Sequence, residues 1–429
     1  MMRSRNIVAV ALLGTLAACG GAADLDQTGA QPQLPKIDER LVPAMKIPRP
    51  TGWDGAVPTV PQGFSIRAIA TDLKVPRQIL VLPNGDILIA EGTGKAAPKL
   101  RPKDVIAGYI KSLGKTPVKG GDRLTLLRDA NGDGDYELRT VFAEGLNAPY
   151  GLALVGGDLY VANQDALVRL AYRNGMTRAD AAPFELTRLP SRINHHWTKA
   201  LTASADGSKL YVGIGSNSNV GERGMGIEED RAVVWEIDRA TGARRTFVSG
   251  IRNPTALAVE PTSGAIWSVV NERDEIGENL VPDYLTSLRP GAFYGWPYSY
   301  WGQTVDPRIR PQRPDLVARA IAPDYALGSH VAALGLSFGT VPGLGQGAFV
   351  GQHGSWNRRT PAGYKVVWVP FSGGKPAGKP RDIVTGFLDA NGKARGRPVG
   401  VTWDAARNAL LVADDLSNTV WRVTISEGR

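Results

Sequence analysis

Two adjacent histidines, His195 and His196, are the residues of this chain best suited to acid–base chemistry. The 429 residues include four histidines in all. The pair comes just before a strand-like run, residues 200–214 (ALTASADGSKLYVGI), so we expect it in the loop that leads into that strand. An unperturbed imidazole titrates near neutral pH, which makes it the usual general base. A loop histidine can also serve only as a hydrogen-bonding residue, so a catalytic role depends on what the rest of the chain brings to this loop.

A hairpin pattern recurs six times along the chain, at intervals of about fifty to eighty residues. In each copy a strand of alternating apolar residues is followed by a turn rich in Gly, Asp or Asn and by a second strand, which is typical of a β-hairpin. No long amphipathic helical pattern lies between the copies. The copies are residues 78–91, 150–163, 200–215, 255–271, 334–352 and 399–415.

Six hairpin repeats in an all-β chain predict a six-bladed β-propeller. The alternatives are a pair of β-sandwiches or a parallel β-helix. Residues 64–70 (FSIRAIA) form a spare strand before the first copy, and residues 421–425 (WRVTI) follow the last. We expect these two segments to pair, because the pairing would close the ring and remove its open edges.

The propeller prediction brings residues from all six copies to one mouth of the central channel. The innermost strand of each blade starts on one face and the second strand returns to it. Residues before the first strand and after the second therefore meet at that face. The resulting set is rich in His and Arg, with a few amides and carboxylates, and predicts a site for a multiply charged anion. Its members include His195, His196, Arg252, Asn253, Arg395, Arg397, Asn271, Glu272, Arg273, Asp274, His353 and Asp415.

The N-terminal sequence is typical of an export signal. Arg3 and Arg5 precede an apolar run, residues 7–16, which is too short for a membrane span. The stretch that ends at Cys19 resembles a bacterial lipobox, and Cys19 is the sole cysteine of the chain. Residues 1–19 are thus expected to be a signal peptide, with Cys19 as the lipidation site of a periplasmic lipoprotein anchored to the outer membrane. Export as an ordinary soluble periplasmic protein is the alternative.

Composition divides the remainder into two parts. Residues 20–62 are rich in Pro and Gly and predict a tether, and residues 63–429 form the propeller, which is the expected catalytic domain. The formal net charge is +9, but the basic residues are scattered. This argues against a nucleic-acid-binding surface and leaves a positive site for an acidic small molecule open.

Four stretches resemble the soluble glucose/sorbosone dehydrogenase family that depends on pyrroloquinoline quinone (PQQ). They are residues 193–219, 249–259 (SGIRNPTALAV), 291–297 (GAFYGWP) and 395–401 (RGRPVGV). Residues 271–274 (NERD) and 351–358 (GQHGSWNR) are similar to the sorbosone-dehydrogenase-like branch. The resemblance implies a six-bladed propeller that holds PQQ and Ca²⁺ and oxidises a sugar, such as an aldose, a sorbosone-like aldehyde or a related alcohol. The electron acceptor stays unknown.

The same resemblance implies roles for individual residues. His196 would remove a proton from a sugar hydroxyl while a hydride passes to the quinone. The cofactor would be bound by Arg252, Asn253, Arg395, Arg397, His353 and Asp415. The family's lysine near the quinone has no clear counterpart in the fifth copy, where His353 or Arg358 would have to replace it.

The metal ligands implied by the resemblance are less regular. Asn271, Glu272 and Arg273 stand where the family offers main-chain oxygens to the cofactor calcium. Asp274, Glu275 and Tyr294 resemble a second calcium site. Separately, residues 129–137 (DANGDGDYE) match the front of a calcium-binding loop, although Thr140 replaces the Glu expected at position twelve. A structural calcium and an acidic, Gly-rich hairpin turn are both open for this loop.

Two other functions compete with a PQQ-dependent dehydrogenase. A metal-dependent lactonase on a six-bladed propeller would need a carboxylate–amide cage on the axis, for which Glu91, Asn163 and Asp415 are candidates. Such a lactonase would not need Arg252, Arg397 or His196. The third possibility is a lipid-anchored binding propeller that has lost its catalytic activity.

Overall fold

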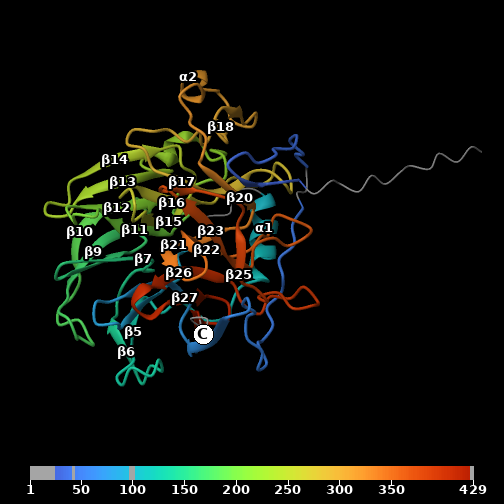
Figure 1. Cartoon of the computed structure of the whole chain (residues 1–429). Helices are drawn as coiled ribbons and strands as arrows, with labels where there is room; N and C mark the ends of the chain where they lie inside the picture. The colour runs from blue at the N-terminus through green and yellow to red at the C-terminus, as the bar shows by residue number, and fades with distance from the viewer. Residues whose placement is uncertain (1–24, 41–43, 96–101, 426–429) are drawn as a thin grey trace, which may run out of the picture.

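Six sheets are arranged around one axis, as the sequence predicts (Figure 1). The computed structural model describes residues 25–40, 44–95 and 102–425. Blade one contains β3 (Pro76–Val81), β4 (Ile87–Glu91), β5 (Arg123–Arg128) and β6 (Leu138–Ala143). Blade two contains β7 (Gly151–Val155), β8 (Asp158–Ala162), β9 (Ala166–Ala171) and β10 (Phe184–Arg188). Blade three contains β11 (Lys199–Ala203), β12 (Lys209–Ile214), β13 (Val233–Asp238) and β14 (Arg244–Ser249).

The other three blades take strands from more distant parts of the chain. Blade four contains β15 (Pro254–Val259), β16 (Ile266–Val270), β17 (Pro282–Ser287), β20 (Tyr325–Ser329) and β1 (Thr28–Gly29). Blade five contains β21 (Ala333–Val341), β22 (Gly345–Gln352), β23 (Lys365–Ser372), β24 (Lys375–Pro376) and β25 (Arg381–Val384). Blade six contains β26 (Pro398–Asp404), β27 (Ala409–Asp414), β28 (Thr419–Ile425) and β2 (Phe64–Ala70).

The ring is closed by the pairing of β2 with β28 in blade six. Phe64 pairs with Ile425 and Ala68 with Trp421 in antiparallel register. The predicted closure is therefore confirmed. The six predicted hairpins are also present, as the antiparallel pairs β3–β4, β7–β8, β11–β12, β15–β16, β21–β22 and β26–β27.

Apolar side chains fill the spaces between neighbouring blades. Blades five and six share one such core, which includes the fully buried Trp368 and Phe349. Blades two and three share another around Trp235. Since each strand alternates its side chains between two faces, every blade packs against both of its neighbours. The innermost strands are thereby held in register around the axis.

Near the axis the strands approach so closely that side chains are excluded. A Cβ on Gly151 would lie 2.6 Å from the carbonyl oxygen of Lys199 in the next blade, which is closer than real contacts allow. The hydroxyl of Tyr150 donates to Leu334 O at 3.1 Å, and Gln78 Nε2 donates to the same oxygen at 3.0 Å. A cavity of about 100 Å³ lies among the innermost strands. The channel is thus narrowed below its mouth by the side chains of Tyr150 and Gln78, and we expect a ligand site at the mouth.

Residues 25–40 and 44–62, part of the predicted tether, lie against the blades. β1 pairs with β20, Asp38 N donates to Ile276 O, and Thr51 N donates to Ala394 O. The structure differs here from a free tether, because backbone groups of this segment bond directly to blades four and six. Residues 1–24, including the predicted signal peptide and Cys19, lie outside the described residues.

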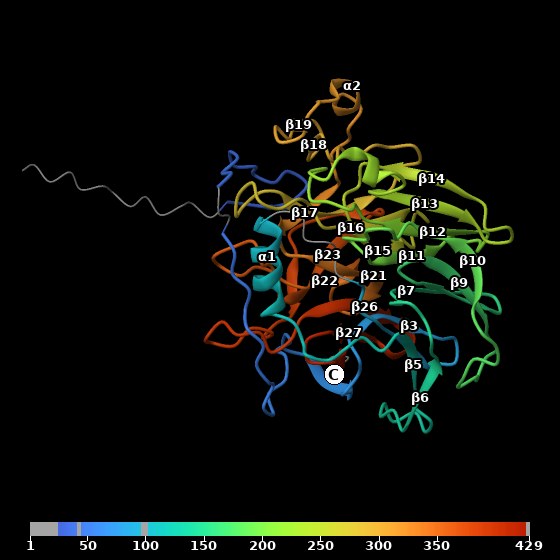
Figure 2. The ribbon, with the colours of Figure 1, turned by 180° about the vertical axis from the view of Figure 1, so that it is seen from behind.

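Two insertions interrupt the blades. The first contains α1 (Pro102–Ser112), which Figure 2 shows as a separate helix beside the sheets. The second contains the short strands β18 (Ser299–Tyr300) and β19 (Thr304–Val305) and the helix α2 (Pro314–Val317). Within the part of the chain that the structure describes, neither helix has the length and apolar character needed to cross a membrane.

Candidate active site at the mouth of the propeller

His196 lies in the loop that leads into β11, as expected. Its Nδ1 is 2.8 Å from Ser216 O and 3.0 Å from Ser216 Oγ. Because a carbonyl oxygen can only accept, this contact places the proton on Nδ1 and leaves the lone pair on Nε2. Burial, together with the nearby charges of Arg252, His195 and Arg231, lowers the pKa of His196 well below its usual value. The imidazole is therefore a neutral base.

The neighbouring His195 presents a nitrogen without a partner. Its ring meets that of His196 edge-on, with centroids 4.7 Å apart. Among the described residues, its buried Nδ1 has no hydrogen-bond partner. Burial and the charges of Lys111 and Arg252 lower the pKa of His195 to about 3. This second neutral imidazole offers an unused polar atom beside His196.

Arg252 is held at the start of blade four by main-chain oxygens. Its Nη1 donates to Asn271 O at 3.1 Å and to Glu272 O at 2.6 Å, and its Nε donates to Asn219 O at 3.1 Å. Ser216 N donates to Arg252 O at 2.8 Å, which joins this residue to the His196 loop. The adjacent Asn253 is buried, and its Oδ1 has no partner among the described residues. Gly215 leaves the space that Asn253 and the His196 loop require, since a Cβ at Gly215 would lie 2.6 Å from His196 Cβ.

On the other side of the mouth, His353 and Asp415 form a buried network with two arginines. His353 Nε2 lies 2.9 Å from Asp415 Oδ1, and Arg77 Nη1 donates to Asp415 Oδ2 at 2.7 Å. Arg397 donates to His353 O and Gly354 O, both at 3.0 Å. Arg77 also lies over the Trp197 ring, 5.1 Å from its centroid, which connects this network to the residue after His196. The structure therefore brings His196, His353, Asp415 and Arg397 to one mouth.

Arg395 and Tyr294 lie apart from these groups. The Arg395 guanidinium is 5.9 Å from the ring centroid of Trp53, a residue of the N-terminal segment that packs on the core of blades five and six. The Tyr294 hydroxyl donates to Ser287 O at 2.5 Å, within the core of blades three and four. The family resemblance implied that both belong to the site, but their side chains pack elsewhere.

Most of the five consecutive residues proposed as metal ligands, Asn271 to Glu275, are engaged by other protein groups. Glu272 and Asp306 both pair with the fully buried Arg273, at 2.9 and 3.1 Å. Asp274 Oδ1 lies 3.3 Å from His330 Nδ1. Glu275 N donates to the amide oxygen of Asn357 at 2.9 Å. Asn271 differs, because its buried Oδ1 has no partner in the described part of the chain.

Several residues at the mouth were not anticipated. Lys111, from α1, lies 3.6 Å above the ring of Trp356, and its charge acts on Asp274, Arg252 and His195. It brings a lysine to the mouth from an insertion, whereas Arg358 turns away and donates to Glu278 O at 2.7 Å. The first insertion has no hairpin pattern from which this placement could be inferred. The pairing of Arg77 with Asp415 was missed although Arg77 lies at the start of β3, an innermost strand.

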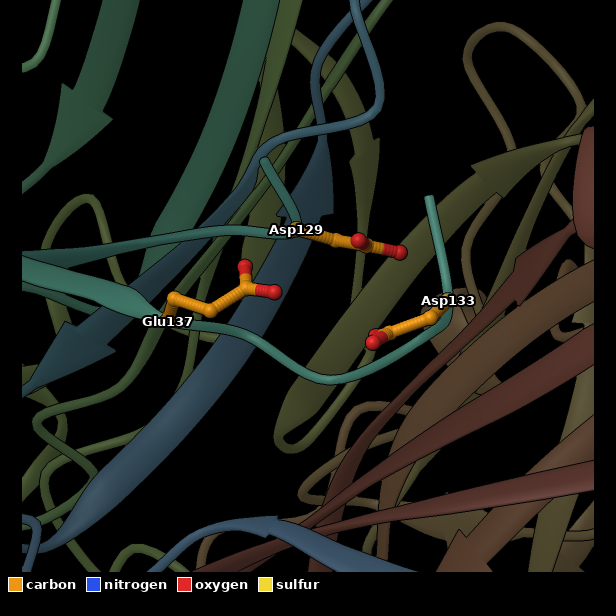
Figure 3. Close-up of side chains that lie close together, drawn as sticks. All are labelled: Asp129, Asp133 and Glu137. Carbon is orange, nitrogen blue, oxygen red and sulfur yellow. The ribbon is translucent and has the colours of Figure 1, made fainter. Parts of the chain in front are cut away.

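The acidic loop 129–137 forms a second cluster, far from the mouth at the tip of β5 and β6. Carboxylate oxygens of Asp129, Asp133 and Glu137 lie within 4.8 Å of one another (Figure 3). Asp129 accepts from the amides of Gly132 and Gly134, at 2.6 and 2.8 Å, so the loop is closed by its own hydrogen bonds. Both interpretations of this loop, a calcium site and an acidic turn, stay open.

Comparison with known proteins supports the same fold. Residues 59–276, about half of the chain, match the family model "Domain of unknown function (DUF7133)", and residues 315–426 match the model "TrAA12-like". A PQQ-dependent pyranose dehydrogenase of Coprinopsis cinerea is 27% identical, with 54% of this chain and 40% of that protein covered. An uncharacterized protein of Borreliella burgdorferi is 28% identical, with 53% and 60% covered. The chain thus spans 40% to 60% of the length of these curated relatives.

Solved structures extend the comparison over the whole propeller. The PQQ domain of the Coprinopsis cinerea pyranose dehydrogenase superposes with a TM-score of 0.69 at 21% identity, covering 88% of this chain and 98% of that domain. A family AA12 enzyme of Trichoderma reesei gives the same TM-score and identity, with 90% and 100% covered. The chain therefore belongs to the DUF7133 family, and its six-bladed propeller is of the kind found in PQQ-dependent sugar dehydrogenases.

Proposed function

We propose that this protein is a PQQ-dependent oxidoreductase that oxidises a sugar at the mouth of its propeller. The observation that supports this most directly is His196, a half-buried neutral imidazole with its lone pair on Nε2, set between two arginine-containing networks. The names of the relatives point to the same chemistry.

The residues at the mouth fit PQQ, which carries three carboxylates. Arg397 bonds only to carbonyl oxygens and forms no ion pair among the described residues, so its charge is available to an anion. Lys111 likewise forms no ion pair there. Polar atoms without partners supply further contacts, namely those of His195, Asn253, Asn271 and Gln352. We propose that Arg252, Asn253 and Arg397 hold the cofactor, with His353 and Asp415 fixing Arg77 and the Arg397 loop.

His196 would act as the general base. A substrate hydroxyl within hydrogen-bond reach of Nε2 would lose its proton to that atom, while the bond from Nδ1 to Ser216 O keeps the ring in one tautomer. When bound, PQQ would supply the acceptor for the hydride that leaves the carbon bearing this hydroxyl.

Calcium fits these residues less well than PQQ does. The carbonyl oxygens of Asn271 and Glu272, which the resemblance assigns to calcium, accept hydrogen bonds from Arg252. A calcium ion at these oxygens would have to replace the guanidinium, and we derive no step from it. Titration of PQQ into the protein with and without EDTA tests the calcium prediction, and a calcium requirement would mean that Arg252 leaves both carbonyls.

The rival lactonase cage is not supported by two of its three proposed ligands, Glu91 and Asp415. Glu91 is fully buried and pairs with Arg123 at 3.0 Å, and Asp415 is bonded to His353 and Arg77. Neither carboxylate is directed freely to the axis.

The central test is reconstitution. Purified protein is mixed with PQQ and Ca²⁺, and dye reduction is followed with a panel of aldoses and sorbosone-like aldehydes. We expect a PQQ-dependent rate with at least one sugar and its loss in His196→Asn. No spectral change on adding PQQ would contradict the proposal, and lactone hydrolysis with a divalent metal and no quinone would favour the lactonase.

The finer predictions have their own tests. The sorbosone-like branch predicts oxidation of an aldehyde sugar in that panel, and the electron acceptor can be sought by replacing the dye with quinones or cytochromes. We also propose a lipid anchor at Cys19 in the periplasm. Labelled fatty acid should enter the wild-type protein and not Cys19→Ala.

A further inference from the structure

Two buried cations lie behind the His196 loop without carboxylate partners. Lys199, the first residue of β11, is fully buried, and Arg231, which precedes β13, is 4% exposed. Neither forms an ion pair with any residue that the structure describes, in contrast to the buried Arg273. Burying an unpaired charge is costly unless hydrogen bonds compensate it. The hydrogen bonds of Lys199 and Arg231 therefore indicate which groups these two side chains hold in place.

Both side chains donate to oxygens on either side of His196. Arg231 Nη2 donates to His196 O at 2.9 Å, and Nη1 donates to Pro190 O at 2.7 Å and to Asn194 Oδ1 at 3.1 Å. Lys199 Nζ donates to the same Asn194 Oδ1 at 2.9 Å and to Trp197 O at 3.0 Å. Residues 190–197 are thus fixed both before and after the imidazole.

Arg231 also contacts the oxygen that accepts the hydrogen bond from the imidazole. Its Nη2 lies 3.4 Å from Ser216 O, the oxygen that accepts from His196 Nδ1. Asn194, which both cations bind, has a φ of 56°, a left-handed conformation that asparagine tolerates and that turns the chain toward the mouth. The pair therefore fixes the path of the loop and the orientation of the ring together.

We propose that Lys199 and Arg231 are positioning residues for His196, which hold its loop through main-chain oxygens and Asn194 Oδ1, and that Arg231 also disfavours a positive charge on its ring. The inference rests on the proposed role of His196 as a base. A neutral amide at position 231 could hold the same oxygens, so the charge retained on Arg231 is the part with chemical consequence for the ring. A cation close to the imidazole in a buried site raises the free energy of the imidazolium.

Other charges face His196 and have to be separated from this effect. His195 and Arg252 also act on the ring and disfavour its protonation. The Glu228 carboxylate acts on Arg231 and accepts from Asn217 N at 2.7 Å, and Asp165 acts on Lys199. These groups stay in place when only Lys199 or Arg231 is changed.

The test compares Arg231→Gln and Lys199→Gln, which keep a hydrogen-bond donor without the charge, with Arg231→Lys, which keeps the charge. Arg245→Gln is the matched control, because Arg245 lies exposed on β14 of the same blade and pairs with Glu236. The first readout is an NMR titration of the His196 Cε1–H in protein without PQQ, assigned by its loss in His196→Asn. The second is kcat and KM of the reconstituted enzyme.

We expect Arg231→Gln to raise the titration midpoint of His196 by about one pH unit, and Arg231→Lys and Arg245→Gln to leave it near wild type. Both Gln variants should lower kcat about tenfold with KM changed less than twofold. An unchanged midpoint in Arg231→Gln would overturn the proposal. If that variant does not fold, Arg231→Lys decides, since a raised midpoint despite the retained charge would also overturn it.

The titration needs neither PQQ nor sugar. Absence of PQQ-dependent activity in the wild type would refute the proposed function and leave the titration result standing. The two failures are therefore distinguishable.

Discussion

The two sides of the mouth hold histidines in opposite electrostatic settings. His196 bonds to a carbonyl and a hydroxyl and is approached by Arg252 and Arg231, with no carboxylate on its ring. His353 bonds through Nε2 to Asp415, which in turn binds Arg77. Burial and Arg397 still lower the pKa of His353, to about 4, against the opposite effect of Asp415.

This difference indicates that His196 can act as a base, whereas His353 holds neighbouring residues in place. Nε2 of His196 has no partner among the described residues, so it can take a proton from a ligand. The same atom of His353 is occupied by Asp415, and its main-chain oxygen holds Arg397. Although the sequence places both histidines at the same mouth, the hydrogen bond of one ring nitrogen decides which of them can do acid–base chemistry.

Removing His196 should have the largest effect. His196→Asn keeps a polar side chain but no base, and we expect kcat of the reconstituted enzyme to fall by about 10²- to 10⁴-fold. PQQ affinity, measured by the change in its absorbance, should change less than threefold. His353→Asn should lower kcat by no more than about tenfold. Equal losses in the two variants would contradict the distinction between base and support.

The arginines should come next, through cofactor affinity. Arg252→Met and Arg397→Met each remove charge-assisted hydrogen bonds worth about 1.5–3 kcal/mol, which corresponds to a weakening of PQQ binding by about 10- to 100-fold. Isothermal titration measures the loss, with the exposed Arg245→Met as control. An affinity within twofold of wild type in both variants would show that PQQ does not contact this mouth.

The acid limb of the pH profile should be flat where an ordinary histidine titrates. Since the pKa of His196 is well below 6.5, the ring stays neutral and competent as pH falls from 8 to about 6. We expect kcat to change less than twofold over that range, checked in buffers of constant ionic strength. A loss of activity with a midpoint near 6.5 would show that the imidazole titrates normally.

The smallest effect is expected at Arg395, on the outer side of the Arg397 loop. Its side chain stacks on Trp53 instead of entering the mouth. Arg395→Ala should therefore change PQQ affinity less than twofold, in contrast to Arg397→Met, and lower the melting temperature slightly. A tenfold loss of affinity would return Arg395 to the cofactor site.

Local patterns of the sequence were sufficient for the architecture. Period-2 alternation around Gly-containing turns identified all six inner hairpins, and the unpaired segments 64–70 and 421–425 predicted the closure. The same repeating hairpin pattern predicted that His196 lies just before an innermost strand. The placements of Arg395 and Tyr294 could not be obtained in this way, because packing against Trp53 and the blade core decides where those side chains point.

Long-range contacts account for the rest of the site. Lys111 reaches the mouth from an insertion without repeat phase, and Arg231 meets the His196 loop only because of the register of β13 on β12. The partners of a ring nitrogen also depend on atoms far apart in sequence. The family resemblance predicted PQQ-dependent oxidation of a sugar, but it did not predict which charged side chains at the mouth would be paired with opposite charges.

The strand pair that closes the ring has a consequence for biosynthesis. Ser65 and Thr424 touch across this pair although 359 residues separate them. Blade six cannot assemble until β28 has been synthesised, so the growing chain holds β2 as an unpaired strand for nearly the whole of translation. Such non-local pairing slows folding and exposes an edge that can bind other chains. A nascent chain of this protein is thus expected to depend on chaperones until its last blade is complete.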